Sequence, residues 1–181
     1  MRFMVSKGTL QIGVEDLLEF RAARLLLLFH VSDEISQGRP LDVERIAYYD
    51  FFSSHPFLVF GEGAPERLRL ALAGFASHSL SYNSAPQRFT NRRARMQHDL
   101  AYLVSLGLIE VAAVHSRVAY RLTSSGSESA TAFRALYARS FGSAAALVIR
   151  RLKGLSDLQL SKQATVWLGQ DTLLMPILED A

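Results

Sequence analysis

The chain has 181 residues, 49% hydrophobic and 20% charged, which is enough apolar material for one sizeable core. Cysteine is absent, which excludes disulfide bonds, thiolate metal sites and cysteine nucleophiles. The formal net charge of +3 permits contact with nucleic acid without requiring it. Unbroken apolar runs such as Leu25–Phe29 are far shorter than a membrane span, and the first residues lack a secretory signal. We therefore expect a cytoplasmic protein with no membrane contact.

The chain begins with a segment of loose alternation and then changes to helical spacing. Met1–Val14 alternates apolar and polar residues, which predicts a strand or an arm. Val14–Gln37 is apolar around most of its circumference, which is typical of a helix buried on several sides. Gly38 is expected to end this central helix.

Two further helices and a loop are predicted next. A second helix is expected to start with Asp42 as its N-cap and to end before Pro56. A third helical stretch is predicted at about Pro65–Phe75. Ser77–Thr90 is rich in Ser, Asn and Pro, and this composition predicts a loop.

The stretch from Asn91 to Thr123 predicts a helix followed by a β-hairpin. Gly107 is expected to end the helix and turn the chain into a strand at Leu108–Val111. A second strand is predicted at Arg117–Thr123, with Ala112–Ser116 as the hairpin connection. Helix, short helix, helix and hairpin is the element order of a winged helix. We therefore expect an α+β, mostly helical fold, a winged helix-turn-helix with extra N- and C-terminal elements.

The rest of the chain is predicted to form a helical extension. Ser124–Gly126 interrupts the pattern, and helices are expected at about Ser127–Phe141 and Ser143–Lys153. The predicted organisation has three parts: residues 1–14 as the arm, 15–126 as the winged-helix core and 127–181 as the helical extension and tail.

Six arginines are candidates for contact with nucleic acid or with acidic groups of a partner: Arg88, Arg92, Arg93, Arg95, Arg117 and Arg121. Four of them cluster at the start of the helix that precedes the hairpin. A helical projection places Asp99 toward the outer side, where it would oppose a phosphate. In the hairpin, alternation places Arg117, Ala119 and Arg121 on one exposed face. The alternative interpretation of both groups is a solvated surface.

Two segments carry more large apolar side chains than a winged helix of this size needs. Residues 48–60 contribute four candidates for a protein interface: Tyr48, Phe51, Phe57 and Phe60. The C-terminal tail contributes five more: Leu173, Leu174, Met175, Ile177 and Leu178. Burial in the core is the default for the first segment. For the tail, a groove in its own domain and a groove on a partner are both open.

Motifs for catalysis are absent from the sequence. It contains no GxxxxGK[ST] phosphate-binding loop and no GxSxG nucleophile elbow. Its five histidines show no HExxH spacing. We therefore expect a non-enzymatic protein with no cofactor and no metal.

Two stretches carry a likeness to a known family: Arg24–Gly61, which begins RLLLLFHVSDE, and Leu100–Gly126, which contains LGLI and YRLT. They resemble the middle component of bacterial ABC-three component systems, which include the Lamassu-type anti-phage systems. The resemblance implies an accessory subunit of an SMC-like ATPase with long coiled coils. It also implies an effector partner, often a nuclease, and double-stranded DNA as a further candidate partner. The rival hypothesis is a winged-helix transcription regulator, which would need a dimer and a palindromic operator.

Overall fold

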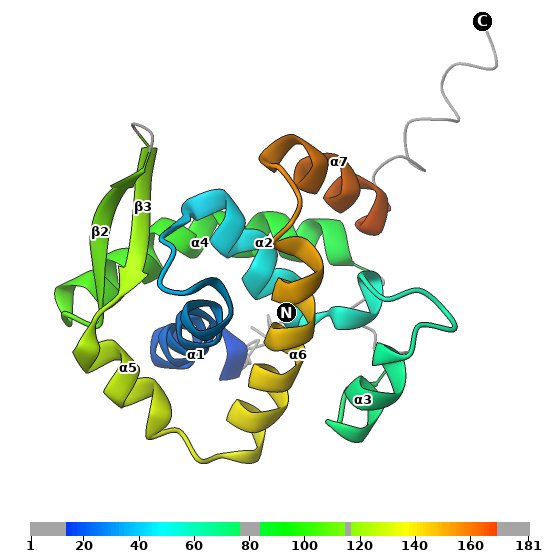
Figure 1. Cartoon of the computed structure of the whole chain (residues 1–181), viewed down its shortest axis with the longest axis horizontal. Helices are drawn as coiled ribbons and strands as arrows, with labels where there is room; N and C mark the ends of the chain where they lie inside the picture. Colours follow the sequence, from blue (N-terminus) through cyan, green and yellow to red (C-terminus); the bar gives the residue numbers. More distant parts are fainter. Residues whose placement is uncertain (1–13, 77–83, 115–116, 170–181) are drawn as a thin grey trace, which may run out of the picture.

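A long helix through the middle of the molecule organises the fold. The computed structural model describes residues 14–76, 84–114 and 117–169, and in it this helix is α1, Leu18–Ser36, preceded by a 3₁₀ turn at Val14–Asp16. All five residues of Leu25–Phe29 are buried, because other helices pack on several sides of α1. Figure 1 shows α1 nearly end-on with α2, α4, α5 and α6 around it. The helix ends where Gln37 and Gly38 take positive φ, so the predicted central helix is confirmed.

The second helix begins and ends where the sequence predicts. It is α2, Val43–Ser54, and the carboxylate of Asp42 accepts a hydrogen bond from the backbone N–H of Arg45 at 2.8 Å. The chain then passes through two short helical elements, η2 Pro56–Leu58 and α3 Glu66–Leu72.

The helix before the hairpin begins earlier than the sequence predicts. It is α4, Ala85–Ser105, so the predicted loop at Ser77–Thr90 is wrong for its last six residues; residues 77–83 lie outside the described part. The reason is that proline fits the first turn of a helix, where its missing N–H is not needed, and that Phe89 is buried on the core. Gly107, with φ 67°, turns the chain off the helix as expected.

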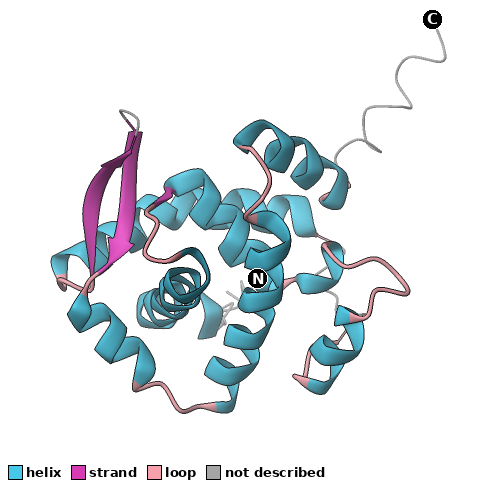
Figure 2. Ribbon diagram, viewed as in Figure 1, coloured by secondary structure: helices cyan, strands magenta, loops and turns pink. Residues whose placement is uncertain are grey.

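A small antiparallel sheet stands at one end of the helical body (Figure 2). Its hairpin consists of β2, Ile109–Val114, and β3, Arg117–Leu122, so β2 runs three residues further than predicted. A two-residue strand, β1, Leu41–Asp42, pairs with β3 and gives the sheet order β1-β3-β2. A strand of two residues shows no alternation, so the sequence pattern does not reveal it.

The C-terminal helices differ from the predicted ones in where they break. They are α5 Ser124–Thr131, α6 Leu136–Leu152 and α7 Asp157–Trp167. The predicted break near Gly142 is wrong, since that glycine lies inside α6 and the chain turns at 132–135 instead. Ser124–Gly126 forms the first turn of α5, because the side chain of Thr123 accepts a hydrogen bond from Gly126 N and caps the helix.

One hydrophobic cluster joins α1, α2, α4 and α6, and α7 adds Leu160 and Ala164 to it. Within the described residues, the fold is mostly helical α+β, with seven α-helices and a three-stranded sheet. The predicted arm, except Val14, lies outside the described residues.

Candidate interaction surface

Arg92 is only partly exposed and points its guanidinium toward the buried carboxylate of Asp50. Its guanidinium is 3.4 Å from the carboxylate of Asp50, which also accepts two hydrogen bonds from Arg24 at 2.7 and 3.1 Å. Arg92 donates further to the hydroxyl of Ser54 at 3.0 Å. Burial alone would raise the pKa of Asp50, but the two guanidinium groups outweigh it and lower that pKa below its usual value. Arg92 thus already holds a carboxylate of its own chain, and its contact with nucleic acid or an acidic partner stays a prediction.

Asp99 is also buried, which corrects the outward position predicted for it. It is 3% exposed, and both of its carboxylate oxygens accept hydrogen bonds from Arg21, at 2.7 and 2.8 Å. The projection of α4 alone placed Asp99 outside because its partner belongs to α1, 78 residues earlier. This bidentate pair fixes α4 against α1 and opposes no ligand.

The exposed arginines of α4 face carboxylates of the same chain. Arg93 donates to Glu44 of α2, with its Nε 3.1 Å from the carboxylate oxygen. Arg95 Nη1 lies 2.8 Å from the carboxylate of Asp16. Arg88 is exposed in the first turn of α4. The cations predicted to gather at the helix start are thus divided among several acidic neighbours.

The arginines of the hairpin are paired as well. Arg117 Nη1 lies 2.7 Å from Asp157 of α7, and Arg121 Nε lies 2.6 Å from Glu110 on the adjacent strand. Ala119 is 2% exposed, and β1 pairs with β3 at this position through Asp42. The predicted exposed face is therefore wrong at its centre and holds only at its two arginines.

The aromatic segment divides between the core and a half-buried edge. Phe51 and Phe60 are 0% and 5% exposed, so they present no surface to a partner in this structure. Tyr48 and Phe57 are half-buried, and the ring of Tyr48 stacks on Phe89 with the centroids 5.3 Å apart. The tail candidates lie outside the described residues: Leu173, Leu174, Met175, Ile177 and Leu178.

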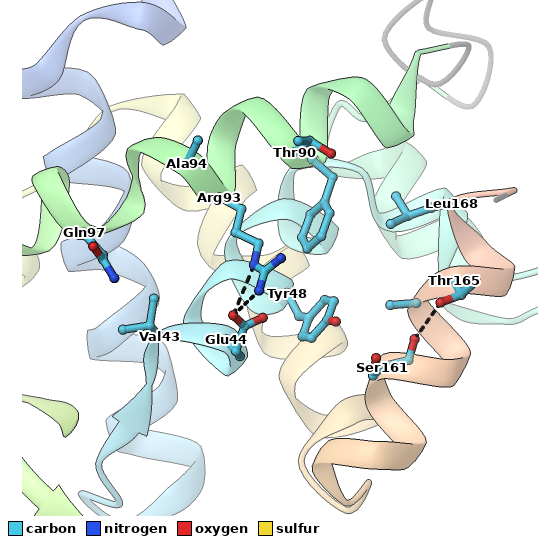
Figure 3. A pocket seen from close by; sticks show the side chains of 12 residues that line it. Val43, Glu44, Tyr48, Thr90, Arg93, Ala94, Gln97, Ser161, Thr165 and Leu168 are labelled. Carbon is cyan, nitrogen blue, oxygen red and sulfur yellow. Dashed lines mark hydrogen bonds and ion pairs between the residues drawn. The ribbon is translucent and has the colours of Figure 1, made fainter. Parts of the chain in front are cut away.

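Half-buried Tyr48 lines an open groove between α4 and α7, with α2 as its floor; we call it the α7 groove (Figure 3). Its volume is about 570 Å³. The Arg93–Glu44 pair crosses it, and Leu168 closes the α7 side. The sequence interpretation missed this side because it placed no helix after Gly154. The capping box, in which Ser156 and Gln159 each bond the other's backbone, is the signal that marks α7 in the sequence.

A charged cluster fastens α7 beside the groove. Asp157 accepts from Arg45 of α2 at 2.7 Å and from Arg117 of the hairpin at 2.7 Å. These hydrogen bonds, that of Arg45 first, lower the pKa of Asp157 below its usual value. The cluster ties α2, β3 and α7 together, so the groove has a defined shape at this end.

Burial also changes one histidine. His55 is 3% exposed, and its Nδ1 lies 3.0 Å from the carbonyl of Phe51, which can only accept, so Nδ1 carries the proton. Burial, with the nearby charge of Arg92, lowers the pKa of His55 to about 4. In the described part of the chain, no three His, Asp or Glu side chains gather to hold a metal ion. Among the same residues, every helix is too short or too polar to span a bilayer.

The described residues form a mostly helical α+β protein with an open groove between α4 and α7. Residues 22–170 match the model of the family described as ABC-three component (ABC-3C) system Middle Component 2. Because this match covers most of the chain, the protein belongs to that family. No curated protein and no solved structure matches the chain significantly.

Proposed function

We propose that this protein is the non-catalytic accessory subunit that joins an SMC-like ATPase to an effector, such as a nuclease, in defence against phages and plasmids. The observation that carries the proposal is the family match over residues 22–170, since a middle component works within a multicomponent system. The sequence supports the non-catalytic role, because it contains no motif for nucleotide binding or nucleophilic catalysis.

The finer fold in this proposal is a winged helix. The chain runs α1, β1, α2, α4, β2, β3, with η2 and α3 inserted between α2 and α4. The hairpin follows α4 directly, and the short β1 lies against β3 at the sheet edge. This order supports the winged-helix proposal, in which α4 takes the place of the recognition helix.

We propose protein contact rather than DNA contact as the main role, because most candidate arginines already form ion pairs within the chain. Five of the six candidate arginines already hold a carboxylate of the same chain. A phosphate would have to displace those carboxylates, and the side chain of Arg92 is only 11% exposed. Residues of α4, including Arg93, also face α7 across the α7 groove, which narrows the approach of a duplex to this flank of the helix.

We assign the α7 groove to an apolar segment of the ATPase. Arg93 and Glu44 neutralise each other there, so an uncharged segment matches the groove better than a charged one. Half-buried Tyr48 and the largely buried Phe89 and Leu168 are large apolar residues of its lining. Contact of the remaining exposed arginines with a DNA backbone is a secondary property in this proposal.

Co-expression with the ATPase and effector encoded beside this chain tests the proposal. We expect a complex that survives size exclusion in both about 0.15 M and about 1 M salt, because an apolar interface is not screened. The variant Ser161→Arg places a large cation in the groove and should release the ATPase. Gln163→Arg is the matched control, since Gln163 is exposed two residues away and does not line the groove.

Two results would contradict the proposed function. A stable monomer that binds no ATPase at either salt concentration would end the subunit proposal. A dimer that binds a palindromic operator, with half-sites about one helical turn apart, would favour the transcription regulator instead. The dependence of the DNA-binding constant on salt concentration would give the number of phosphates that the protein neutralises.

A further inference from the structure

A second groove lies on a different part of the molecule and shares no lining residue with the α7 groove. It runs between α1, α5 and α6, three helices that Figure 1 shows together in the lower half of the view. We call it the α6 groove; its volume is about 960 Å³. Apolar and small side chains form its floor: Leu27, Val31, Ile35, Ala130, Phe133 and Ala146.

Cations border the α6 groove on its α6 side. Arg139, Arg150 and Lys153 all line it, and the spacing of 11 and 3 residues keeps them on one flank of the helix. Within the part of the chain that the structure describes, no carboxylate forms an ion pair with any of the three. Of the lining residues that the structure describes, only Glu34 is acidic; it lies across the groove, 3.5 Å from the imidazole of His30. The border of this groove therefore carries a net positive charge.

A glycine also lines the α6 groove. Gly142 lies in the middle of α6 and lines the groove, although glycine costs a helix interior about 1 kcal/mol relative to alanine. A Cβ atom added there would meet only Val31, at 3.9 Å, so packing of this chain alone does not require glycine. A small residue at the floor allows a second helix to approach α6 at close range.

These features together identify an occupant. From Arg139 to Lys153 the groove follows α6 for about 21 Å, or about four helical turns. An apolar floor requires an apolar stripe, and an unpaired basic border requires acidic residues beside that stripe. We propose that the α6 groove binds an acidic amphipathic helix of a partner protein. The proposal rests on the proposed function only for the identity of that partner, another subunit of the same system.

A duplex is the competing ligand for a row of cations, but the observations favour a protein. Phosphate contact needs no apolar floor, and the floor here has side chains from three helices. DNA is therefore an outcome of the test rather than part of the proposal.

Fluorescence anisotropy with the full chain tests the proposal directly. The probe is a labelled peptide of about 18 residues, helical by design, with leucines at i, i+3, i+4 and i+7 and glutamates on both flanks. A matched peptide carries lysine in place of each glutamate, and a duplex of about 20 base pairs is the third ligand. We expect the acidic peptide to bind about tenfold or more tightly than the basic peptide, and salt to weaken it.

Two charge-matched variants locate the binding. Arg139→Glu/Arg150→Glu reverses two cations of the groove and should weaken the acidic peptide about tenfold or more. Arg134→Glu/Arg151→Glu makes the same change in net charge at exposed positions outside the groove, and should weaken it less than about twofold. Circular dichroism and thermal midpoints of both variants show whether each remains folded.

The outcomes separate this inference from the function on which it rests. Equal effects of the two double variants, or equal binding of the two peptides, would overturn the groove assignment even if the three-subunit complex forms. Duplex binding that only the Arg139/Arg150 variant loses, without peptide binding, would overturn it in favour of DNA. Peptide binding that follows the prediction in a chain that joins no complex would keep the groove and reject the proposed function.

Discussion

Among the described residues, the arginines around the α7 groove form ion pairs with carboxylates, whereas the cations beside the α6 groove form none. Arg93 and Arg117 each hold a carboxylate of another helix or strand, so their charge fastens this protein together. Arg139 and Arg150 line an apolar groove without such a partner among the described residues. A count of arginines along the sequence does not distinguish these two uses of the same side chain. What distinguishes them is whether the fold brings a carboxylate within reach.

The two regions also differ in the burial of their charged groups. Beneath the α4 side lie two buried ion pairs, Arg21–Asp99 and Arg24–Asp50, which join α1 to α4 and α2. Burial of a charge is costly unless its partner is present, so these pairs specify which helices meet rather than simply adding stability. Removing one partner on the α4 side should therefore cost far more than removing a cation of the α6 groove.

The largest effect is expected at Asp50. Asp50→Ala leaves Arg24 and Arg92 without the carboxylate that both share in the core. We expect a loss of about 3–5 kcal/mol in the free energy of unfolding, because buried Arg24 and partly buried Arg92 both lose the charge that balances them. Urea denaturation followed by circular dichroism measures this loss. Exposed Glu62→Ala is the control and should change the midpoint little. A loss below about 1 kcal/mol would mean that the arginines find water or other partners.

A pH dependence follows from the same buried cluster. The folded pKa of His55 is about 4, against an ordinary value of 6.5, so between these values the unfolded state binds a proton that the folded state does not. The stability from this group is complete above pH 6.5 and falls as the pH drops toward 4. The loss is about 2–3 kcal/mol at the lower end.

His55→Gln separates this histidine from the carboxylates. In that variant, the free energy of unfolding should change much less between pH 6.5 and 4.5 than in the original chain. Loss of stability below pH 4 should persist in both, since Asp50 and Asp157 have lowered pKa values that matter there. An identical slope in the two proteins between pH 6.5 and 4.5 would assign it to other groups.

The sequence predicts the elements whose signals are local. Asp42 as an N-cap, Gly107 as a helix end and the apolar run of α1 each depend on residues within a few positions, and each is confirmed. The outward position of Asp99 is wrong for the opposite reason, because its partner Arg21 is 78 residues away in the chain. The exposed position predicted for Ala119 is wrong for a similar reason, since its neighbour in the sheet, Asp42 of β1, is far away in the chain.

The sequence predicts the candidate sites only in part, because each depends on the packing of distant elements. The spacing of Arg139 and Arg150 can be read from the sequence, but a groove beside them exists only because α1 and α5 pack against α6. Gly142 resembles a helix break in the sequence, yet α6 continues through it. Phe51 and Phe60 are as apolar as interface residues, and only the packing of α2 decides that they are core.

Gly126 connects the two regions, since α5 leads from the hairpin toward the α6 groove. A Cβ atom at this position would lie 2.0 Å from the backbone oxygen of Leu108, which cannot move without the hairpin base. Gly126→Ala should therefore cost about 1–3 kcal/mol through overpacking. Gly154→Ala is the control, because its Cβ would meet nothing within 4 Å. Equal stability of the two variants, measured by urea denaturation, would show that α5 can shift freely and that the α6 groove lacks a fixed wall.

The smallest expected effects compare one paired and one unpaired arginine at the surface. A double-mutant cycle on Arg93 and Glu44 should give a coupling free energy of about 0.2–1 kcal/mol, since both side chains are about half exposed and solvent screens their attraction. High salt should reduce this coupling. Arg150→Ala should leave stability unchanged within error, because no carboxylate in the described part of the chain forms an ion pair with it. If Arg150→Ala destabilised the protein as much as Arg93→Ala, the α6 cations would serve the fold as the α4 arginines do. The contrast between the two grooves would then be lost.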